Sequence, residues 1–185
     1  AKNIIYRNKA KVGDDIYVSG NLGDSYFGLL ALQKKININN SSRNYFIKQY
    51  YKPNIQLILA DKLSKFANTS IDISDGLLTD LEKLINNQKL SYKVSLDDIP
   101  VSNSLNKLIS KKNFLKEHCI SKGDDYQVLF TAGVDKSRII INSSKKLGIK
   151  ISKIGKITSN KEKSIIINQK DQHLLVKSSG YKHQF

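Results

Sequence analysis

An apolar stripe with helical spacing follows a short strand pattern and a turn between residues 67 and 85. The pattern predicts a strand over 67–72, a turn at 73–76 and a helix from about Gly76. The stripe consists of Leu77, Leu78, Leu81, Leu84 and Ile85, and Thr79, Lys83 and Asn86 lie on the opposite side. A helix with one apolar face must bury that face, so the chain is expected to form at least two packed layers.

Further strand and helix patterns alternate along the chain. Strands are predicted at 15–19, 92–95 and 127–131, and three more in the tail, at 149–157, 164–168 and 173–177. Helices are predicted at 24–34, 54–65 with Pro53 at the start, 104–110 and 136–147, and the Asn/Ser-rich stretch 36–44 is predicted to be a loop. Because the chain alternates first and then ends rich in strands, we expect an α+β fold, a layered α/β sandwich with a mixed sheet, formed by residues 1–185 as one domain.

The formal net charge of +15 raises the possibility of nucleic-acid binding. The charge is almost entirely lysine, spread evenly, with arginine only at Arg7, Arg43 and Arg138. Proteins that read a DNA groove usually concentrate arginine, which makes bidentate contacts that lysine cannot make. A solvated lysine surface is therefore the favoured interpretation, and a basic nucleic-acid-binding module stays as an alternative.

The lone Cys119 excludes a disulfide framework and a cysteine metal cage. A small buried apolar role is expected for it, although His118 beside it leaves a nucleophile–base pair open. No apolar run approaches the roughly 20 residues of a membrane span. These features predict a cytoplasmic protein without a membrane segment.

Asp72-Ile-Ser-Asp75-Gly places two carboxylates three positions apart at the predicted strand-to-helix turn. Such a pair can converge on Mg²⁺, which takes one or two carboxylates together with phosphate and water. The hydroxyl of Ser74 and the N–H groups at the helix start could face a phosphate. The same residue types are also usual in turns and helix caps, so the spacing alone leaves both interpretations open.

Two further segments combine glycine with acidic residues. Gly20-Asn-Leu-Gly-Asp-Ser25 has no Gly-Lys-Ser/Thr and is not a Walker phosphate loop; a tight turn with Asp24 as a helix cap is expected. Gly123-Asp-Asp-Tyr126 supplies an acidic pair before a strand. That pair could bind a metal, accept a hydrogen bond from an amine, or simply form a solvated loop.

Taken together, these segments resemble the thiamine-monophosphate kinases in order and spacing. The resemblance rests on Val12–Ser25, Ser70–Asp80 and Gly123–Thr131, supported by Ile99-Pro100 and the closing Gly180-Tyr-Lys-His183. It covers nearly the whole chain and favours the metal interpretation of Asp72 and Asp75.

The resemblance implies transfer of the γ-phosphoryl group of ATP to thiamine monophosphate, which yields thiamine diphosphate. The family shares its superfamily with aminoimidazole ribonucleotide synthetase, selenophosphate synthetase and a hydrogenase maturation factor. It has an N-terminal metal-binding and dimerisation domain and a C-terminal α+β domain. This chain resembles only the C-terminal domain, so it is expected to be inactive alone, to need the missing N-terminal domain and to form a homodimer in the full-length protein.

The resemblance also implies roles for individual residues. Asp72 and Asp75 correspond to the Mg²⁺ ligands of the family, and Ser74 and Arg7 to residues that contact ATP. Mg²⁺ and ATP are thus the implied cofactor and co-substrate.

Asp124 and Tyr181 correspond to residues that contact the thiamine substrate. The chain departs from the family pattern here: Asp124 replaces a usual Glu, Lys122 a common Gly and Gln127 a common Glu, and Gln184 precedes the final Phe. These differences lie at the implied substrate end rather than at the implied metal end. A sister activity of the superfamily, a basic nucleic-acid-binding module and a truncated chain without activity stay as alternatives.

Overall fold

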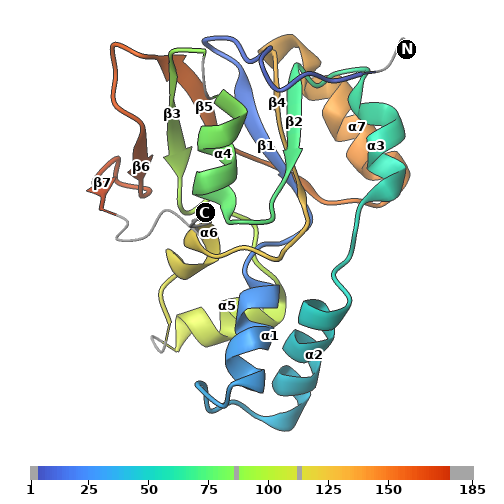
Figure 1. Ribbon diagram of the computed structural model, residues 1–185, viewed down its shortest axis with the longest axis vertical. Helices are drawn as coiled ribbons and strands as arrows, with labels where there is room; N and C mark the ends of the chain where they lie inside the picture. The colour runs from blue at the N-terminus through green and yellow to red at the C-terminus, as the bar shows by residue number, and fades with distance from the viewer. Residues whose placement is uncertain (1–3, 86–87, 112–113, 176–185) are drawn as a thin grey trace, which may run out of the picture.

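The chain forms one mixed β-sheet with helices on both faces and a group of helices at one end (Figure 1). The structure is a computed structural model, and it describes residues 4–85, 88–111 and 114–175. The predicted α+β layered sandwich is confirmed.

Seven strands form the sheet in the order β2-β4-β1-β5-β3-β6-β7. Their bounds are β1 Asp15–Ser19, β2 Thr69–Asp72, β3 Leu90–Ser95, β4 Val128–Ala132, β5 Ile151–Ser159, β6 Ile165–Ile167 and β7 His173–Leu174. Neighbouring strands are antiparallel except β3 and β6, which are parallel. The interior strand β1, between β4 and β5, is buried along its whole length.

Alternation along β1 divides the core between the two faces of the sheet. Ile16 and Val18 lie on the face covered by α4 (Leu77–Ile85), in the largest apolar cluster. Tyr17 lies on the other face, where it stacks on Phe130 at a ring-centroid distance of 5.2 Å. That second face is covered by α3 (Leu57–Leu63) and α7 (Ser137–Leu147), the latter preceded by a short 3₁₀ turn, η1 (Val134–Lys136).

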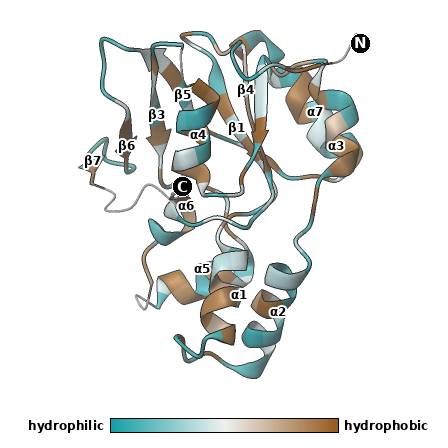
Figure 2. Cartoon of the chain, in the orientation of Figure 1, coloured by the Kyte–Doolittle hydropathy of each residue, from teal (hydrophilic) through white to brown (hydrophobic). Residues whose placement is uncertain are grey.

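The helices α1 (Asp24–Leu32), α2 (Asn40–Tyr51) and α5 (Asn103–Ser110) lie together below the sheet in Figure 1, and we call them the helical end. Its core consists of Phe27, Phe46, Leu105 and Cys119, all completely buried. The short helix α6 (His118–Ser121) lies between this core and α4. Figure 2 shows apolar residues among polar ones along α1, α2 and α5.

Most predicted elements are present, and two local predictions are wrong. The strand at 15–19 and the helix after Gly76 form as predicted. The predicted loop 36–44 instead contains the start of α2, because the Asn39 side chain accepts a hydrogen bond from the Ser42 N–H and caps the helix. Pro53 lies in the α2–α3 connection, because α3 begins only at Leu57.

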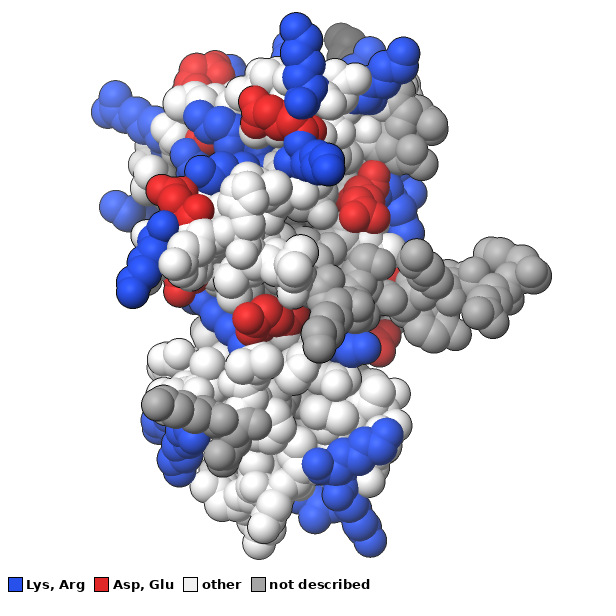
Figure 3. Space-filling model, turned by 90° about the vertical axis from the view of Figure 1, so that its left-hand side faces the viewer, with Lys and Arg blue, Asp and Glu red and all other residues white. Residues whose placement is uncertain are grey.

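None of the helices that the structure describes has the length and apolar character of a membrane span. Lysine and arginine side chains are spread from top to bottom of the face in Figure 3, with acidic residues among them over the upper part. The visible face therefore carries dispersed charge rather than one basic patch.

Candidate functional site

The turn between β2 and α4 is held by one buried carboxylate. Asp80 Oδ2 accepts the backbone N–H groups of Ser74, Asp75 and Gly76, at 2.9, 2.9 and 3.2 Å. The Asp80 side chain is about 1% exposed, and it lies in the first turn of α4. The helix dipole stabilises negative charge near a helix N-terminus, so an aspartate is favourable at this position. We call residues 72–76 the acidic loop.

Lys83 links the acidic loop to the same carboxylate. Its Nζ donates to Asp75 Oδ2 and to Asp80 Oδ1, the latter at 2.8 Å. Partial burial lowers the pKa of Lys83, but the two carboxylates outweigh it, so the pKa lies above its usual value. Lys83 therefore remains a cation beside Asp75.

A second segment runs beside the acidic loop and extends the β2–β4 pairing. The N–H of Ile73 donates to the Gln127 carbonyl at 2.8 Å, and the Tyr126 N–H donates to the Ile73 carbonyl at 2.9 Å. The Asp124 N–H donates to the Ser74 carbonyl, also at 2.9 Å. Residues 123–127 and the acidic loop, far apart in sequence, thus form one structural unit.

Gly123 permits this close approach. A Cβ atom on it would lie 1.9 Å from the Ser74 carbonyl oxygen, a distance that no side chain can adopt. Any larger residue would therefore push the 123–127 segment away from the acidic loop.

Asp124 and Tyr126 both have left-handed backbone conformations, with φ of 67° and 50°. Such angles are rare for bulky residues and cluster at functional sites. Partial burial raises the pKa of the Tyr126 hydroxyl, and the nearby carboxylates of Asp124, which accepts its hydrogen bond, Asp72 and Asp75 raise it further. The three acidic side chains therefore lie near one exposed phenol.

The donor chemistry of this unit suits Mg²⁺. Asp72 and Asp124 are exposed and Asp75 is partly exposed, and all offer oxygen ligands. Within the described ranges, no group of three or more His, Cys, Asp or Glu side chains is arranged to hold a metal ion. A pair of carboxylates that leaves the other positions to phosphate and water is the usual protein share of a magnesium site.

The glycine turn before α1 contains a second pair of carboxylates, and these are buried. Asp24 does not cap the helix as predicted: its oxygens accept hydrogen bonds from Ser102 Oγ at 2.7 Å and from the Tyr45 hydroxyl at 2.8 Å. The Gly23 N–H donates instead to Asp125 Oδ2 at 2.8 Å. Burial raises the pKa of Asp24 and raises that of Asp125 well above its usual value. Two acids at this helix start disfavour an anion there.

These buried acids line a polar cleft of about 430 Å³ between the helical end and the sheet, which Lys48 and Lys52 also border. Gln127 lies at its wall and is 4% exposed. Its Oε1 accepts a hydrogen bond from Ser19 Oγ, and its Nε2 donates to the Asn54 carbonyl at 3.0 Å. A glutamate could not make the second bond while ionised, so this departure from the family pattern has a local structural reason.

The structure brings together Asp72, Ser74, Asp75 and Asp124, but not Arg7. The Arg7 carbonyl accepts a hydrogen bond from Gln88 Nε2, beyond the C-terminal end of α4. The acidic loop precedes the other end of this helix, which is about 13 Å long. Tyr181 lies outside the described residues.

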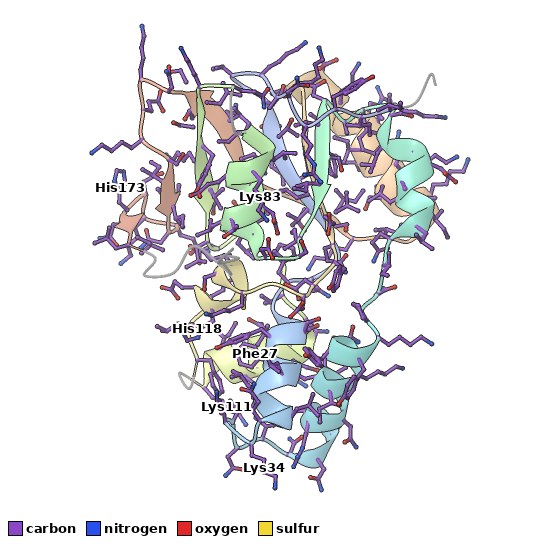
Figure 4. The ribbon with its side chains drawn as sticks, in the orientation of Figure 1. Phe27, Lys34, Lys83, Lys111, His118 and His173 are labelled. Atoms are coloured by element: carbon purple, nitrogen blue, oxygen red, sulfur yellow. The ribbon has the colours of Figure 1, made fainter. Side chains whose placement is uncertain are left out.

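Cys119 is buried as predicted, in the apolar core of the helical end. Burial raises the pKa of its thiol far above the usual value, which opposes thiolate formation. His118, labelled on α6 in Figure 4, packs edge-on against Tyr26 of α1 at 6.4 Å between ring centroids.

Three residues at the site were not predicted from sequence: Asp80, Lys83 and Tyr126. A signal existed for Asp80, which lies at helical spacing from Leu77 and Leu84 within the apolar stripe and must therefore be buried with it. An acid on a buried helix face needs donors nearby.

Comparison with known proteins places the chain among homologous sequences. No protein-family profile matches the chain. The thiamine-monophosphate kinase of Buchnera aphidicola subsp. Schizaphis graminum is 37% identical over 183 residues, covering 98% of this chain and 56% of the relative. That of Escherichia coli K12 is 29% identical over 178 residues, covering 96% and 54%. The chain spans about half the length of the curated relatives it matches.

Solved structures share the fold. The thiamine-monophosphate kinase of Stenotrophomonas maltophilia K279a superposes with a TM-score of 0.79 at 27% identity, covering 90% of this chain and 53% of that protein. AaThiL complexed with AMPPCP and TMP gives 0.77 at 24% identity, covering 96% and 54%. The E. coli hydrogenase maturation protein HypE gives 0.69 at 13% identity, covering 93% and 52%, a likeness of fold alone. The chain is therefore, over almost its whole length, a homologue of the thiamine-monophosphate kinases that corresponds to about half of such a protein.

Proposed function

We propose that the chain is the C-terminal domain of an ATP-dependent kinase that converts thiamine monophosphate to thiamine diphosphate. The observation that carries the proposal is the unit formed by the acidic loop and residues 123–127, joined by the Asp124–Ser74 hydrogen bond of 2.9 Å. These belong to two of the segments through which the chain resembles the kinases. The AaThiL complex with AMPPCP and TMP supports an ATP-like molecule and TMP as ligands of this fold.

In this proposal Asp72 and Asp75 hold Mg²⁺ and Ser74 contacts ATP. The bound ion would supply neutralisation of the triphosphate charge, which is the main requirement of phosphoryl transfer. The chain's own contribution is positional. Asp80 fixes the backbone N–H groups of the loop, and the loop in turn fixes the direction in which the two carboxylates point.

Asp124 and Tyr181 are proposed to contact the thiamine substrate, and Arg7 to contact ATP. The support for Arg7 and Tyr181 is the resemblance alone. Arg7 lies at the far end of α4 from the acidic loop, so its role needs an ATP molecule or a neighbouring domain that reaches that end.

The proposal includes the rest of a full-length kinase. An N-terminal domain would complete the metal site and form a homodimer, and the 185-residue chain alone would be inactive. A cytoplasmic location agrees with the lone buried Cys119 and with ATP as co-substrate.

The test uses the complete gene product with Mg²⁺-ATP and thiamine monophosphate, and measures thiamine diphosphate by chromatography. Asp72→Asn and Asp75→Asn each remove a ligand charge, so turnover should fall by more than about 100-fold with the fold retained. Asp61→Asn is the matched control, because Asp61 is an exposed carboxylate on α3, which covers the other face of the sheet.

Wild-type turnover in either loop variant would rule out the metal assignment. No product from a folded, ATP-binding wild-type protein would instead favour a sister activity of the same superfamily.

A further inference from the structure

Lys83 is a cation that contacts the acidic loop, and it occupies a defined place there. It reaches from α4 toward the loop (Figure 4) and pairs with Asp75 and Asp80. The side chains are 42% exposed for Lys83, 15% for Asp75 and 1% for Asp80.

The two ion pairs of Lys83 differ in how firmly the partner is held. Asp80 is buried, and its second oxygen accepts three backbone hydrogen bonds, so this carboxylate cannot move away from Lys83. Asp75 lies in the turn and has greater access to solvent. Lys83 is thus anchored on Asp80, and its contact with Asp75 is the more exchangeable of the two.

We propose that Lys83 is a positioning residue that occupies the Asp75 carboxylate until a divalent cation replaces it. The inference rests on the proposed function, because it needs Asp75 to be a metal ligand. In the metal-free protein the ammonium pairs with both Asp75 and Asp80. When the ion binds, Lys83 leaves Asp75 and retains its bond to Asp80.

The physical reason is competition between two cations for one carboxylate. An ammonium in contact with the Asp75 oxygen lies within a few ångströms of any ion bound there, and like charges at that distance repel. The divalent ion attracts the carboxylate more strongly, so Lys83 is displaced. The Asp75 carboxylate then has two alternative partners, the Lys83 ammonium and the divalent ion.

The first measurement is the affinity of the complete gene product for Mn²⁺, followed by electron paramagnetic resonance. Lys83→Met removes the competing ammonium and keeps a side chain of similar length, so Mn²⁺ should bind about three- to tenfold more tightly. Lys83→Arg retains the charge and should stay within about twofold of the wild type. Lys93→Met is the matched control, because Lys93 is similarly exposed and pairs with Asp171 on the far side of the sheet.

A second measurement separates displacement from a general effect of charge. Lysine acetylation with an amine-reactive reagent, read by mass spectrometry, should be slow at Lys83 without metal and several-fold faster with saturating Mg²⁺. Lys93 should react equally under both conditions.

Unchanged or weaker Mn²⁺ binding by Lys83→Met, or Lys83 labelling that does not respond to Mg²⁺, would overturn the inference while leaving the metal site in place. If Asp75→Asn binds Mn²⁺ as well as the wild type, the metal assignment itself fails, and this inference fails with it.

Discussion

Asp80 shows how much one side chain can organise at the residue scale. One of its oxygens accepts three consecutive backbone N–H groups, and the other holds Lys83. Those N–H groups precede α4, where no backbone carbonyl of the helix can accept them. Asp80 therefore fixes the turn from inside the helix that follows it, a role usually filled by a residue before the helix.

Asp125 is a buried acid with a different effect. Folding raises the pKa of Asp125, so this acid binds its proton more tightly in the folded protein. The stability that the proton contributes is fully present below the unfolded pKa, near about 4, and is lost as the pH rises through the folded pKa. Asp125→Asn removes the charge and keeps an acceptor for Gly23. We expect the free energy of unfolding to decline less between about pH 4.5 and pH 8 than in the wild type, as measured by urea unfolding.

The control for this prediction is Asp135→Asn, because the Asp135 side chain is 73% exposed and pairs only with its neighbour Lys136 among the ion pairs described. It should leave the pH dependence unchanged. Identical pH profiles for Asp125→Asn and the wild type would mean that Asp125 does not titrate across this range.

At the scale of elements, the contact between α1 and α2 depends on Gly28. A Cβ atom there would lie 2.3 Å from the Phe46 carbonyl oxygen and 2.7 Å from Tyr50 Cβ. Alanine normally stabilises a helix interior by about 1 kcal/mol relative to glycine. Here the backbone of α2 blocks it, so Gly28→Ala should instead reduce the free energy of unfolding by about 1–3 kcal/mol in urea.

The sign of the change decides this prediction. Asn142→Ala, at an exposed position of α7, reports helix propensity without the steric conflict and should stay within about 0.5 kcal/mol of the wild type or slightly above it. If Gly28→Ala instead raised the free energy of unfolding, α1 and α2 would be able to move apart without losing stability.

Elements with strong local patterns could be predicted, and those that depend on distant partners could not. β1 and α4 follow from alternation and from one apolar stripe. The start of α2 was missed because its Asn/Ser-rich cap has the composition of a loop. The turn that carries Asp72 and Asp75 between β2 and α4 follows from the sequence pattern, whereas the approach of Gly123 to Ser74 depends on tertiary packing that no local pattern contains.

At the scale of the whole molecule, the excess of positive charge acts against the compact state. The net charge is +15, and few of the lysines have a carboxylate partner among the described ion pairs. Repulsion among like charges is screened as the Debye length falls from about 20 Å to 7 Å between 0.02 and 0.2 M salt. The midpoint of thermal unfolding should therefore rise by a few degrees over this range of NaCl concentration, measured by circular dichroism.

A lower or constant midpoint over the same range would mean that the lysines are already neutralised locally. Sodium chloride suits the measurement because salts that are strongly excluded from protein surfaces would stabilise the fold by a second route.

The order of the strands also determines when the fold can form during synthesis. β1 leaves the ribosome before the other six strands. Its neighbour β4 follows only after helices α1 to α6, and its other neighbour β5 only after helices α1 to α7. Until then the centre of the sheet has no partner on either edge, and its apolar side chains stay accessible to other chains. The sheet therefore cannot be completed, and its strands stay vulnerable to aggregation or to capture by a chaperone, until β5 has been made.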